Sequence, residues 1–348
     1  MPSSSITQSK NRSLRAQALP ALLEDVVKAY DLPVRRILPP QKGYRNRSFP
    51  IQLKDGAYVN FILYKEELGI LEVIRSANRV SAYAADRGFP SRRPLGPIAC
   101  LRGASGRTKY GALYDYLSGH TIPWEAYTMD HLKLLGKTLG DLHAVLRPLS
   151  RKALPAVTDI YAGIVDRMTR YLADPGVQAA LQHKLGLRLA PAQFQKYRRL
   201  LDACAALPRQ QALHMDFVRG NILFNDEPAT TRPSDLKVTI SGILDFEKTA
   251  FGHPLFDIAR TLAFLLVDCK FKTGDKVRKH FLFSGYARRS QASLPNQPEL
   301  LDALIDLFLT YDFYKFLRHN PYEALPANEH FVRTKQLLAQ RGLLQLSR

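Results

Sequence analysis

The sequence has few cysteines and no long apolar run, and both shortages narrow what the chain can be. Only three cysteines occur among 348 residues, and their spacing fits neither a disulfide framework nor a zinc site. No run of about 18 apolar residues is present, so neither a membrane-spanning helix nor a membrane partner is expected. The most apolar helical candidate, residues 258–267, is too short to cross a bilayer and contains Arg260. We therefore expect a cytoplasmic protein in which Cys100, Cys204 and Cys269 are buried apolar side chains.

Acidic residues are absent from the start of the chain and outnumbered throughout it. The first 18 residues are rich in serine and basic side chains, contain no acid and lack the apolar core of a secretory signal. This composition predicts a disordered basic tail; an organelle transit peptide shares it and is the alternative. The whole chain contains 50 Lys and Arg but only 31 Asp and Glu, which gives a net charge of +19.

The positive charge bears on the ligands that the chain attracts. A long-range positive potential favours anions such as ATP and repels polycations unless acids line their site. The basic residues are spread over segments such as 184–199 and 278–289, not gathered in one dense tract with interleaved aromatics. Such segments are typical of solvated helix faces, so nucleic acid is not an expected partner.

Length and apolar periodicity indicate two lobes. Single cores usually stop growing at about 250 residues, and this chain is longer. No internal repeat is apparent. Strands are expected from residue 47 onward, at 57–64 and twice within 98–116, before a helical region. The expected helices are residues 19–32, 70–87, 128–146, 156–172, 191–206, 258–267, 275–288 and 300–317.

An acid, an amide and a second acid are spaced as phosphoryl transfer from Mg-ATP requires. His214, Asp216 and Asn221 form the pattern H-x-D-x-x-x-x-N, and Asp245 follows in Asp-Phe-Glu. One carboxylate must orient and deprotonate an acceptor hydroxyl, while an amide and another carboxylate hold the magnesium that neutralises the phosphates. Either pattern alone is common by chance. Their joint occurrence indicates a small-molecule kinase.

These polar groups lie beside short apolar segments. Residues 212–215 and 221–224 are expected to be strands on either side of the Asp216 loop, and residues 238–246 a third strand. We therefore expect the Asp216 loop and the strand that carries Asp245 to face each other across one hairpin-like sheet.

Four blocks in chain order carry a family resemblance. They are the phosphate-loop candidate at residues 43–49, Leu-Tyr-Asp-Tyr-Leu-Ser-Gly at 113–119, the H-x-D-x-x-x-x-N loop, and the segment 243–259. On these blocks, over residues 38–266, the sequence resembles the aminoglycoside phosphotransferase and choline kinase-like family, distant relatives of the protein kinases. The second block is similar to that family's interlobe hinge, and the fourth to its magnesium strand.

The resemblance implies an α+β, bilobal, protein-kinase-like fold. It would have a small antiparallel-sheet N-lobe over residues 19–117, which binds nucleotide, and a larger, mostly helical C-lobe over residues 118–348. ATP and Mg²⁺ are the implied cofactors, and the hydroxyl of a small molecule is the implied acceptor.

The resemblance also implies roles for individual residues of the C-lobe. Asp216 would be the catalytic base, Asn221 and Asp245 the metal ligands, and Asp257 a structural acid that braces the catalytic loop. The chemistry of the groups supports the first three independently. For Asp257 the alternative is an acid in the first turn of a helix, where carboxylates are favoured. His214 is expected to hold the loop through hydrogen bonds to the backbone, not to transfer protons.

The loop departs from the family pattern at two places. Family members usually have Gly after the His and Pro inside the loop, whereas Met215 and the pair Val218-Arg219 stand here. Arg219 is expected either to contact a phosphate or an anionic substrate, or to be a surface charge.

The phosphate-binding lysine of the kinase pattern has one candidate. Lys65 follows the strand at residues 57–64, where a lysine held by a helix Glu pairs with the α- and β-phosphates. Counting back from the loop at residues 88–90 instead puts Asn78 at the Glu position and Ile62 near the Lys position. We expect Lys65 to pair with Glu72 or Asn78 in a shifted register. The alternative is that the ion pair is lost, with phosphate contacts from Arg45, Arg47 and backbone amides.

Other nucleotide contacts are expected from the phosphate loop and the hinge. Gly43 and Asn46 would expose backbone amides to the phosphates, although a turn with Gly and Asn before a strand need not bind anything. Backbone groups from Tyr114 to Tyr116 would bind the adenine edge. A pseudokinase-like module that binds nucleotide or nucleic acid without turnover is the competing hypothesis. A protein kinase is a third, weakened because no Ala-Pro-Glu segment follows. The sequence does not indicate the identity of the acceptor, whether ATP or GTP is the phosphate donor, or the oligomeric state.

Overall fold

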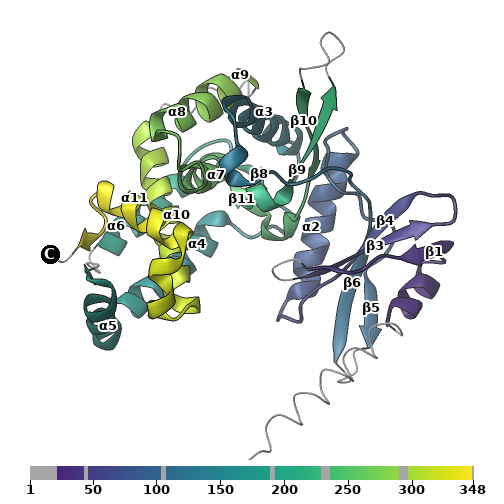
Figure 1. Ribbon diagram of the computed structural model, residues 1–348, viewed down its shortest axis with the longest axis horizontal. Helices are drawn as coiled ribbons and strands as arrows, with labels where there is room; N and C mark the ends of the chain where they lie inside the picture. Colours follow the sequence, from purple (N-terminus) through teal and green to yellow (C-terminus); the bar gives the residue numbers. More distant parts are fainter. Residues whose placement is uncertain are drawn as a thin grey trace, which may run out of the picture. The chain divides into compact units, whose positions relative to one another are not determined.

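The chain folds as two compact units. The computed structural model describes residues 22–42, 46–102, 107–188, 193–228, 236–289 and 297–346. Unit 1 comprises Met1–Ala85 and Ser91–Ser118, and unit 2 comprises Asp86–Pro90 and Gly119–Arg348. Among the described helices, none combines the length and the apolar character that crossing a membrane requires. Figure 1 shows the strands of unit 1 in purple and blue and the helices of unit 2 in colours that run from teal through green to yellow.

Unit 1 is built on an antiparallel sheet. Its strand order is β1-β3-β4-β6-β5, and the short strand β2 pairs with the start of β3. A tight turn joins β3 to β4: Gly56 has φ +90°, and the Asp55 carboxylate accepts from the Ala57 N–H. The strands are β1 (Val34–Ile37), β2 (Gln41–Lys42), β3 (Arg47–Leu53), β4 (Tyr58–Leu63), β5 (Ala99–Arg102) and β6 (Thr108–Asp115).

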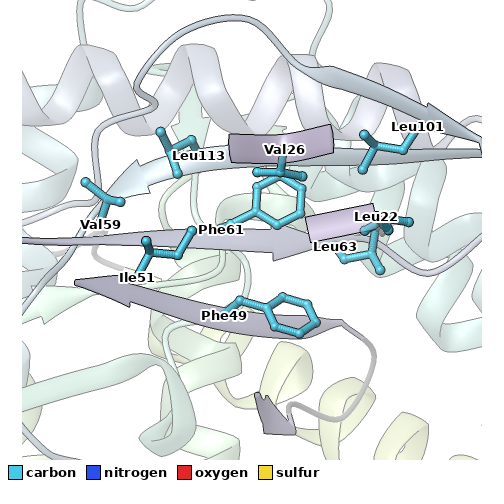
Figure 2. Close-up of a cluster of buried hydrophobic side chains, with 9 residues drawn as sticks. All are labelled: Leu22, Val26, Phe49, Ile51, Val59, Phe61, Leu63, Leu101 and Leu113. Carbon is cyan, nitrogen blue, oxygen red and sulfur yellow. The ribbon is translucent and has the colours of Figure 1, made fainter. Parts of the chain in front are cut away.

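Side chains alternate between two apolar layers on this sheet. Odd-numbered residues of β4, such as Phe61 and Leu63, pack with Leu22 and Val26 of the helical residues 22–29 (Figure 2). The next residues along, Ile62 and Tyr64, pack instead with α2 (Ile70–Ala85). Because successive side chains point to opposite faces, the residue number decides which layer each one joins.

The same alternation corrects one expectation. Cys204 and Cys269 are buried as expected, but Cys100 is exposed. Cys100 lies on β5 at the edge of the sheet, where its neighbour Leu101 takes the buried side.

Unit 2 is mostly helical, so the expected fold class, a small antiparallel sheet followed by a helical lobe, is confirmed. The helices expected at 128–146, 156–172 and 300–317 are present within two residues of the expected ends. The helices are α3 (Met129–Leu146), α4 (Val157–Leu172), α5 (Pro175–Leu185), α6 (Gln193–Ala205), α7 (Leu255–Asp268), α8 (Gly274–Arg278), the π-helix η4 (Lys279–Tyr286), α9 (Ala287–Arg289), α10 (Pro298–His319) and α11 (Glu329–Gln340).

Two helices were not expected from the sequence, and one expected helix is interrupted. Neither α5 nor α11 was predicted, although α5 begins with a recognisable signal: Asp174 caps it and Pro175 is its first residue. The helix expected at 275–288 is divided into α8, η4 and α9.

Two small sheets of unit 2 frame the polar loop. β8 (Gln211–Leu213) pairs with β11 (Ala250–Gly252), and β9 (Ile222–Pro228) pairs with β10 (Leu236–Ile243). The single hairpin-like sheet expected from the sequence is therefore wrong. The loop after β8 turns away at Met215, and the unpredicted strand β11 takes the place beside β8. A third two-stranded sheet joins β7 (Leu187–Arg188) to β12 (Gln345–Leu346).

Candidate active site

The loop between β8 and β9 carries His214, Asp216 and Asn221. Its sharp turn is at Met215, which has φ +61°, although its side chain is buried. The left-handed conformation costs a non-glycine residue about 1–2 kcal/mol. This is the position where the sequence has Met in place of the glycine of the family pattern, so a residue type that disfavours the left-handed conformation adopts it here.

Asp257 is the buried acid that holds this turn. It lies in the first turn of α7, and its carboxylate accepts hydrogen bonds from the backbone N–H groups of His214 at 2.8 Å and Met215 at 2.5 Å. Burial acts to raise the pKa of Asp257, but hydrogen bonds from His143 and His214 outweigh it and lower that pKa below its usual value. Asp257 therefore agrees with both alternatives raised by the sequence: it lies in the first turn of a helix, and its carboxylate contacts the loop.

A second layer of contacts supports Asp257. The Nε2 of His143 on α3 lies 3.1 Å from the Asp257 carboxylate, and its Nδ1 lies 2.7 Å from the Tyr286 hydroxyl. Tyr286 is the last residue of the π-helix η4. Neither His143 nor Tyr286 was identified from the sequence. The available signal was a histidine on the apolar stripe of α3, because a buried polar group requires a partner.

His214 is fully buried and links the loop to Leu244, which lies between the end of β10 and Asp245. Its Nδ1 accepts from the Asp216 N–H at 3.1 Å, and its Nε2 lies 3.1 Å from the Leu244 carbonyl oxygen. Burial lowers the pKa of His214 despite the nearby carboxylates. A neutral ring with the proton on Nε2 fits both contacts, which is the backbone-holding arrangement described above.

Both carboxylate oxygens of Asp216 are contacted by donors. The Asn221 Nδ2 donates to Oδ2 at 3.2 Å and to the Asp216 carbonyl oxygen at 3.0 Å. The Lys248 Nζ lies 2.8 Å from Oδ1. Lys248 was not identified from the sequence, although it is the residue directly after the Asp-Phe-Glu segment. The signal was a cation within three positions of a candidate metal ligand.

Asp245 and Asn221 present oxygens of the kind that Mg²⁺ binds. Asp245 has φ +58°, and the described part of the chain places only the Glu247 N–H, at 3.4 Å, on its Oδ1. The Asn221 amide nitrogen faces Asp216, which leaves its Oδ1 uncommitted among the described residues. The Leu244 N–H donates to the Asn221 carbonyl and joins the two segments.

The donor set fits Mg²⁺ bound with nucleotide better than a metal held by protein alone. No group of three or more His, Cys, Asp or Glu suited to a metal occurs in the described residues. Mg²⁺ is commonly held by one or two carboxylates together with substrate phosphates and water. One carboxylate and one amide oxygen match that pattern.

In unit 1, the expected pairing of Lys65 with Glu72 or Asn78 is wrong. The Lys65 Nζ lies 3.4 Å from Glu67 on the surface, and Glu72 pairs with Arg75. Lys65 comes after the end of β4, where the alternation takes its side chain away from the α2 layer that Tyr64 joins. The ion-paired lysine of the kinase pattern is therefore not found at this position.

A hydrogen-bonded chain of neutral side chains lies where the count from residues 88–90 places the Lys–Glu pair. The Tyr114 hydroxyl lies 2.6 Å from that of Tyr64 and donates to the Asn78 Oδ1 at 2.5 Å. Ile62, the other position indicated by the count, packs against α2. The alternative in which the Lys–Glu pair is lost thus agrees with the structure.

The remaining candidates are placed as follows. Gly43 and Arg45 lie outside the described residues, whereas the Asn46 Oδ1 accepts from the Lys65 N–H at 3.2 Å. The Asp115 N–H already donates to the Arg93 carbonyl oxygen, and Tyr116 follows the end of β6 with an exposed ring. These contacts leave the backbone at Tyr116 as the more accessible part of the expected adenine segment.

Arg219 lies in the polar loop itself. It starts the short 3-10 helix η2 (Arg219–Asn221), and its side chain is partly exposed. With Tyr127 and Asp268 it lines a small cavity beside the loop.

Known structures share this fold at low sequence identity. One is an amicoumacin kinase in complex with AMP-PNP, Ca²⁺ and Ami, with 12% identity, a TM-score of 0.65, and coverage of 91% of this chain and 93% of that one. Another is a microcompartment-associated aminopropanol kinase, with 17% identity, a TM-score of 0.63 and coverage of 91% and 99%. A third is the macrolide 2′-phosphotransferase of Brachybacterium faecium, with 16% identity, a TM-score of 0.56 and coverage of 91% and 96%.

The sequence comparisons identify the family. No curated protein sequence matches the chain. The model of the phosphotransferase enzyme family matches residues 36–290, which contain the loop from His214 to Asn221, Asp245 and Asp257. The family resemblance seen in the sequence is confirmed, and the chain belongs to the phosphotransferase enzyme family.

Proposed function

We propose that the chain is an ATP-dependent kinase that transfers the γ-phosphoryl group to a hydroxyl of a small molecule. The observation that carries the proposal is the linkage of three groups in unit 2. The Asn221 side chain donates to Asp216, and the Asn221 carbonyl accepts from Leu244, the neighbour of Asp245. These hydrogen bonds support the assignment of Asp216 as base and of Asn221 and Asp245 as metal ligands, because phosphoryl transfer needs such groups held together.

The residues divide the work of an in-line displacement. Asp216 orients the acceptor hydroxyl and takes its proton as the oxygen bonds to the γ-phosphorus and the bond to the β-phosphate oxygen breaks, which leaves ADP. Asn221 through Oδ1 and Asp245 through its carboxylate would hold Mg²⁺, which neutralises phosphate charge. His214 and Asp257 keep Asp216 in position and take no part in proton transfer.

Nucleotide contacts are proposed from two segments of unit 1, the phosphate loop and the hinge segment. Gly43, Asn46 and Arg47 would contact phosphates, and the backbone around Tyr114 and Tyr116 would bind the base. Lys65 would add only a surface charge near the phosphate loop. Arg219 would contact an anionic group of the acceptor or a phosphate.

The acceptor is proposed to be neutral or anionic. The three related structures are an amicoumacin kinase, an aminopropanol kinase and a macrolide phosphotransferase, so acceptors differ widely on this fold. A net charge of +19 disfavours a polycation such as an aminoglycoside. Another related structure, an aminoglycoside 2′-phosphotransferase, is a complex with GDP, so GTP is to be tested beside ATP.

One observation favours a second candidate, a module that binds nucleotide without turnover. The place of the Lys–Glu pair holds the neutral chain of Tyr64, Tyr114 and Asn78. Such a module would bind Mg-nucleotide but release no product.

Phosphate transfer from Mg-ATP and Mg-GTP across a pooled metabolite panel tests both candidates. We expect a phosphorylated product with the native chain, a loss of about 10²–10⁴-fold in Asp216→Asn, and no product in Asp245→Ala. Asp130→Asn is the matched control, because Asp130 is a surface acid on α3 paired with Lys133. Nucleotide-dependent thermal shift on the same samples separates lost chemistry from lost folding. Binding without product in any pool would favour the inactive module, and absent binding would overturn both.

A further inference from the structure

In the described part of unit 1, no lysine lies at the position where kinases hold their phosphate-binding lysine, and the buried cation nearby is Arg92, whose guanidinium lies 4.2 Å from the centroid of the Tyr114 ring. The side chains of β4 that join the α2 layer are Ile62 and, just beyond the strand, Tyr64. The helix position opposite them is Asn78, which accepts from Tyr114. Phosphoryl transfer nevertheless concentrates negative charge on the transferred group, and a cation there is a recurring requirement.

Unit 2 contains a cation beside the proposed base. Lys248 ends the short turn η3 (Phe246–Lys248), and the residue that caps this turn is Asp245. Its Nζ lies 2.8 Å from the Asp216 Oδ1. One turn of chain therefore carries both a proposed metal ligand and an ammonium group that reaches the proposed base.

The exposure of the two partners shows that Lys248 enters from the solvent side. The Lys248 side chain is 46% exposed, whereas that of Asp216 is 8% exposed. An ammonium on a flexible, half-exposed stem moves at little cost, while the carboxylate beneath it is fixed by Asn221 and by its own loop.

The contact itself argues for movement during the reaction. A carboxylate that accepts a proton from a hydroxyl needs an oxygen open to that hydroxyl. With Lys248 on Oδ1 and Asn221 on Oδ2, the acceptor hydroxyl has to share an oxygen with one of these donors unless Lys248 moves. Lys248 is the exposed partner, so it is the one that leaves when an anionic phosphate is nearby.

We propose that Lys248 is a catalytic residue whose ammonium leaves Asp216 and contacts the phosphoryl group being transferred, supplying the charge that the strand lysine supplies in the kinase pattern. This inference rests on the proposed function of the same site. In the balanced step the acceptor oxygen bonds to phosphorus, the bond to the β-phosphate oxygen breaks, and the acceptor proton passes to Asp216. The Lys248 ammonium exchanges no proton in this step and stabilises the charge on the phosphoryl oxygens, as Lys and Arg cations do at phosphoryl-transfer centres.

The test measures nucleotide binding without turnover. In the Asp216→Asn background, calorimetry with Mg²⁺ compares affinities for ATP and ADP, which differ by the γ-phosphoryl group. We expect Lys248→Met to weaken ATP binding about tenfold and to leave ADP binding within about twofold, as for loss of one charge-assisted contact. If Lys248 served only to neutralise Asp216, the substitution would change neither affinity in this background.

Lys133→Met is the matched control. Lys133 also pairs with an aspartate at 2.8 Å, and its side chain is 40% exposed, close to the value for Lys248. Lys65→Met tests the rival lysine. An ATP-specific loss in Lys65→Met, or equal behaviour of Lys248→Met and Lys133→Met, overturns the inference while ATP binding by the native chain still supports the proposed function. Absence of ATP binding by the native chain overturns both.

Discussion

The carboxylate of Asp257 and the Nε2 of His143 lie 3.1 Å apart, and both side chains are almost completely buried. They come from different helices, α7 and α3, and they meet behind the loop that carries Asp216. The geometry of that loop is thus set by contacts outside it.

Asp257→Asn is expected to destabilise unit 2 by about 3 kcal/mol, because in either amide orientation the NH2 group would face a donor, either the Met215 N–H or the His214 N–H beside His143. Urea unfolding followed by circular dichroism measures the change. The control Asp130→Asn removes an exposed acid and is expected to change stability by less than about 0.5 kcal/mol. Equal effects of the two substitutions would contradict the bracing role.

Met215→Gly is expected to be more stable than Met215→Ala by about 1 kcal/mol. Both remove the buried side chain, but only glycine adopts φ +61° without strain. At Met168, which is buried within α4, the order is expected to reverse, because alanine is the better helix residue. Unfolding free energies of the four variants provide the comparison, and the same order at both sites would refute the assignment of strain.

His253 is expected to make the protein less stable in mild acid. Burial lowers the pKa of His253 to about 4 from an ordinary value of 6.5, and its Nδ1 accepts from the Leu255 N–H. Between about pH 4 and pH 6.5 the unfolded chain binds more protons at His253 than the folded chain does. The stability that neutral His253 contributes is therefore complete above pH 6.5 and is lost as the pH falls toward about 4. The expected loss is of order 2–3 kcal/mol.

His253→Asn checks this dependence because the amide oxygen can accept from Leu255 without titrating. Unfolding free energies measured from pH 7 to pH 4 are expected to slope less in this variant than in the native chain. His319→Asn, at an exposed position, should retain the native slope. A native slope in His253→Asn would assign the acid sensitivity to other groups.

Gly136→Ala is expected to destabilise unit 2 and to displace η4. An added Cβ would lie 2.0 Å from the Phe281 carbonyl oxygen and 2.7 Å from the Tyr286 nitrogen, both backbone atoms. The expected cost is about 1–3 kcal/mol. On α4, Gly163→Ala meets nothing closer than 3.6 Å and should stabilise by about 0.5–1 kcal/mol. Thermal unfolding distinguishes these opposite signs, and a neutral Gly136→Ala would exclude tight packing there.

Local sequence patterns were enough to predict helices and the type of reaction, but not which side chains and strands contact one another. The spacing of His214, Asp216, Asn221 and Asp245 indicated a phosphoryl-transfer site, and α3, α4 and α10 followed from apolar periodicity. The Tyr114–Asn78 hydrogen bond joins residues 36 positions apart, and no local rule connects them. Similarly, β11 formed a strand because β8 was available to pair with it.

Lysine placement failed for a related reason. The prediction for Lys65 rests on its position after a strand, but the face that a side chain takes depends on the register of β4 against β6. A shift of one residue would exchange the two faces. Lys248, which carries the contact with Asp216, lies in a turn without periodicity and could be found only from the folded chain.

The support that α3 and α7 give to the loop carrying Asp216 has a consequence for protein engineering. A loop held by its own glycine and proline could be moved to another scaffold as a short peptide. Here the turn at Met215 is imposed by Asp257, which is held in turn by His143 and Tyr286. The smallest transplantable unit is therefore a set of four segments far apart in the chain, and a search for related enzymes by loop sequence alone would overlook members that share the brace but not the glycine.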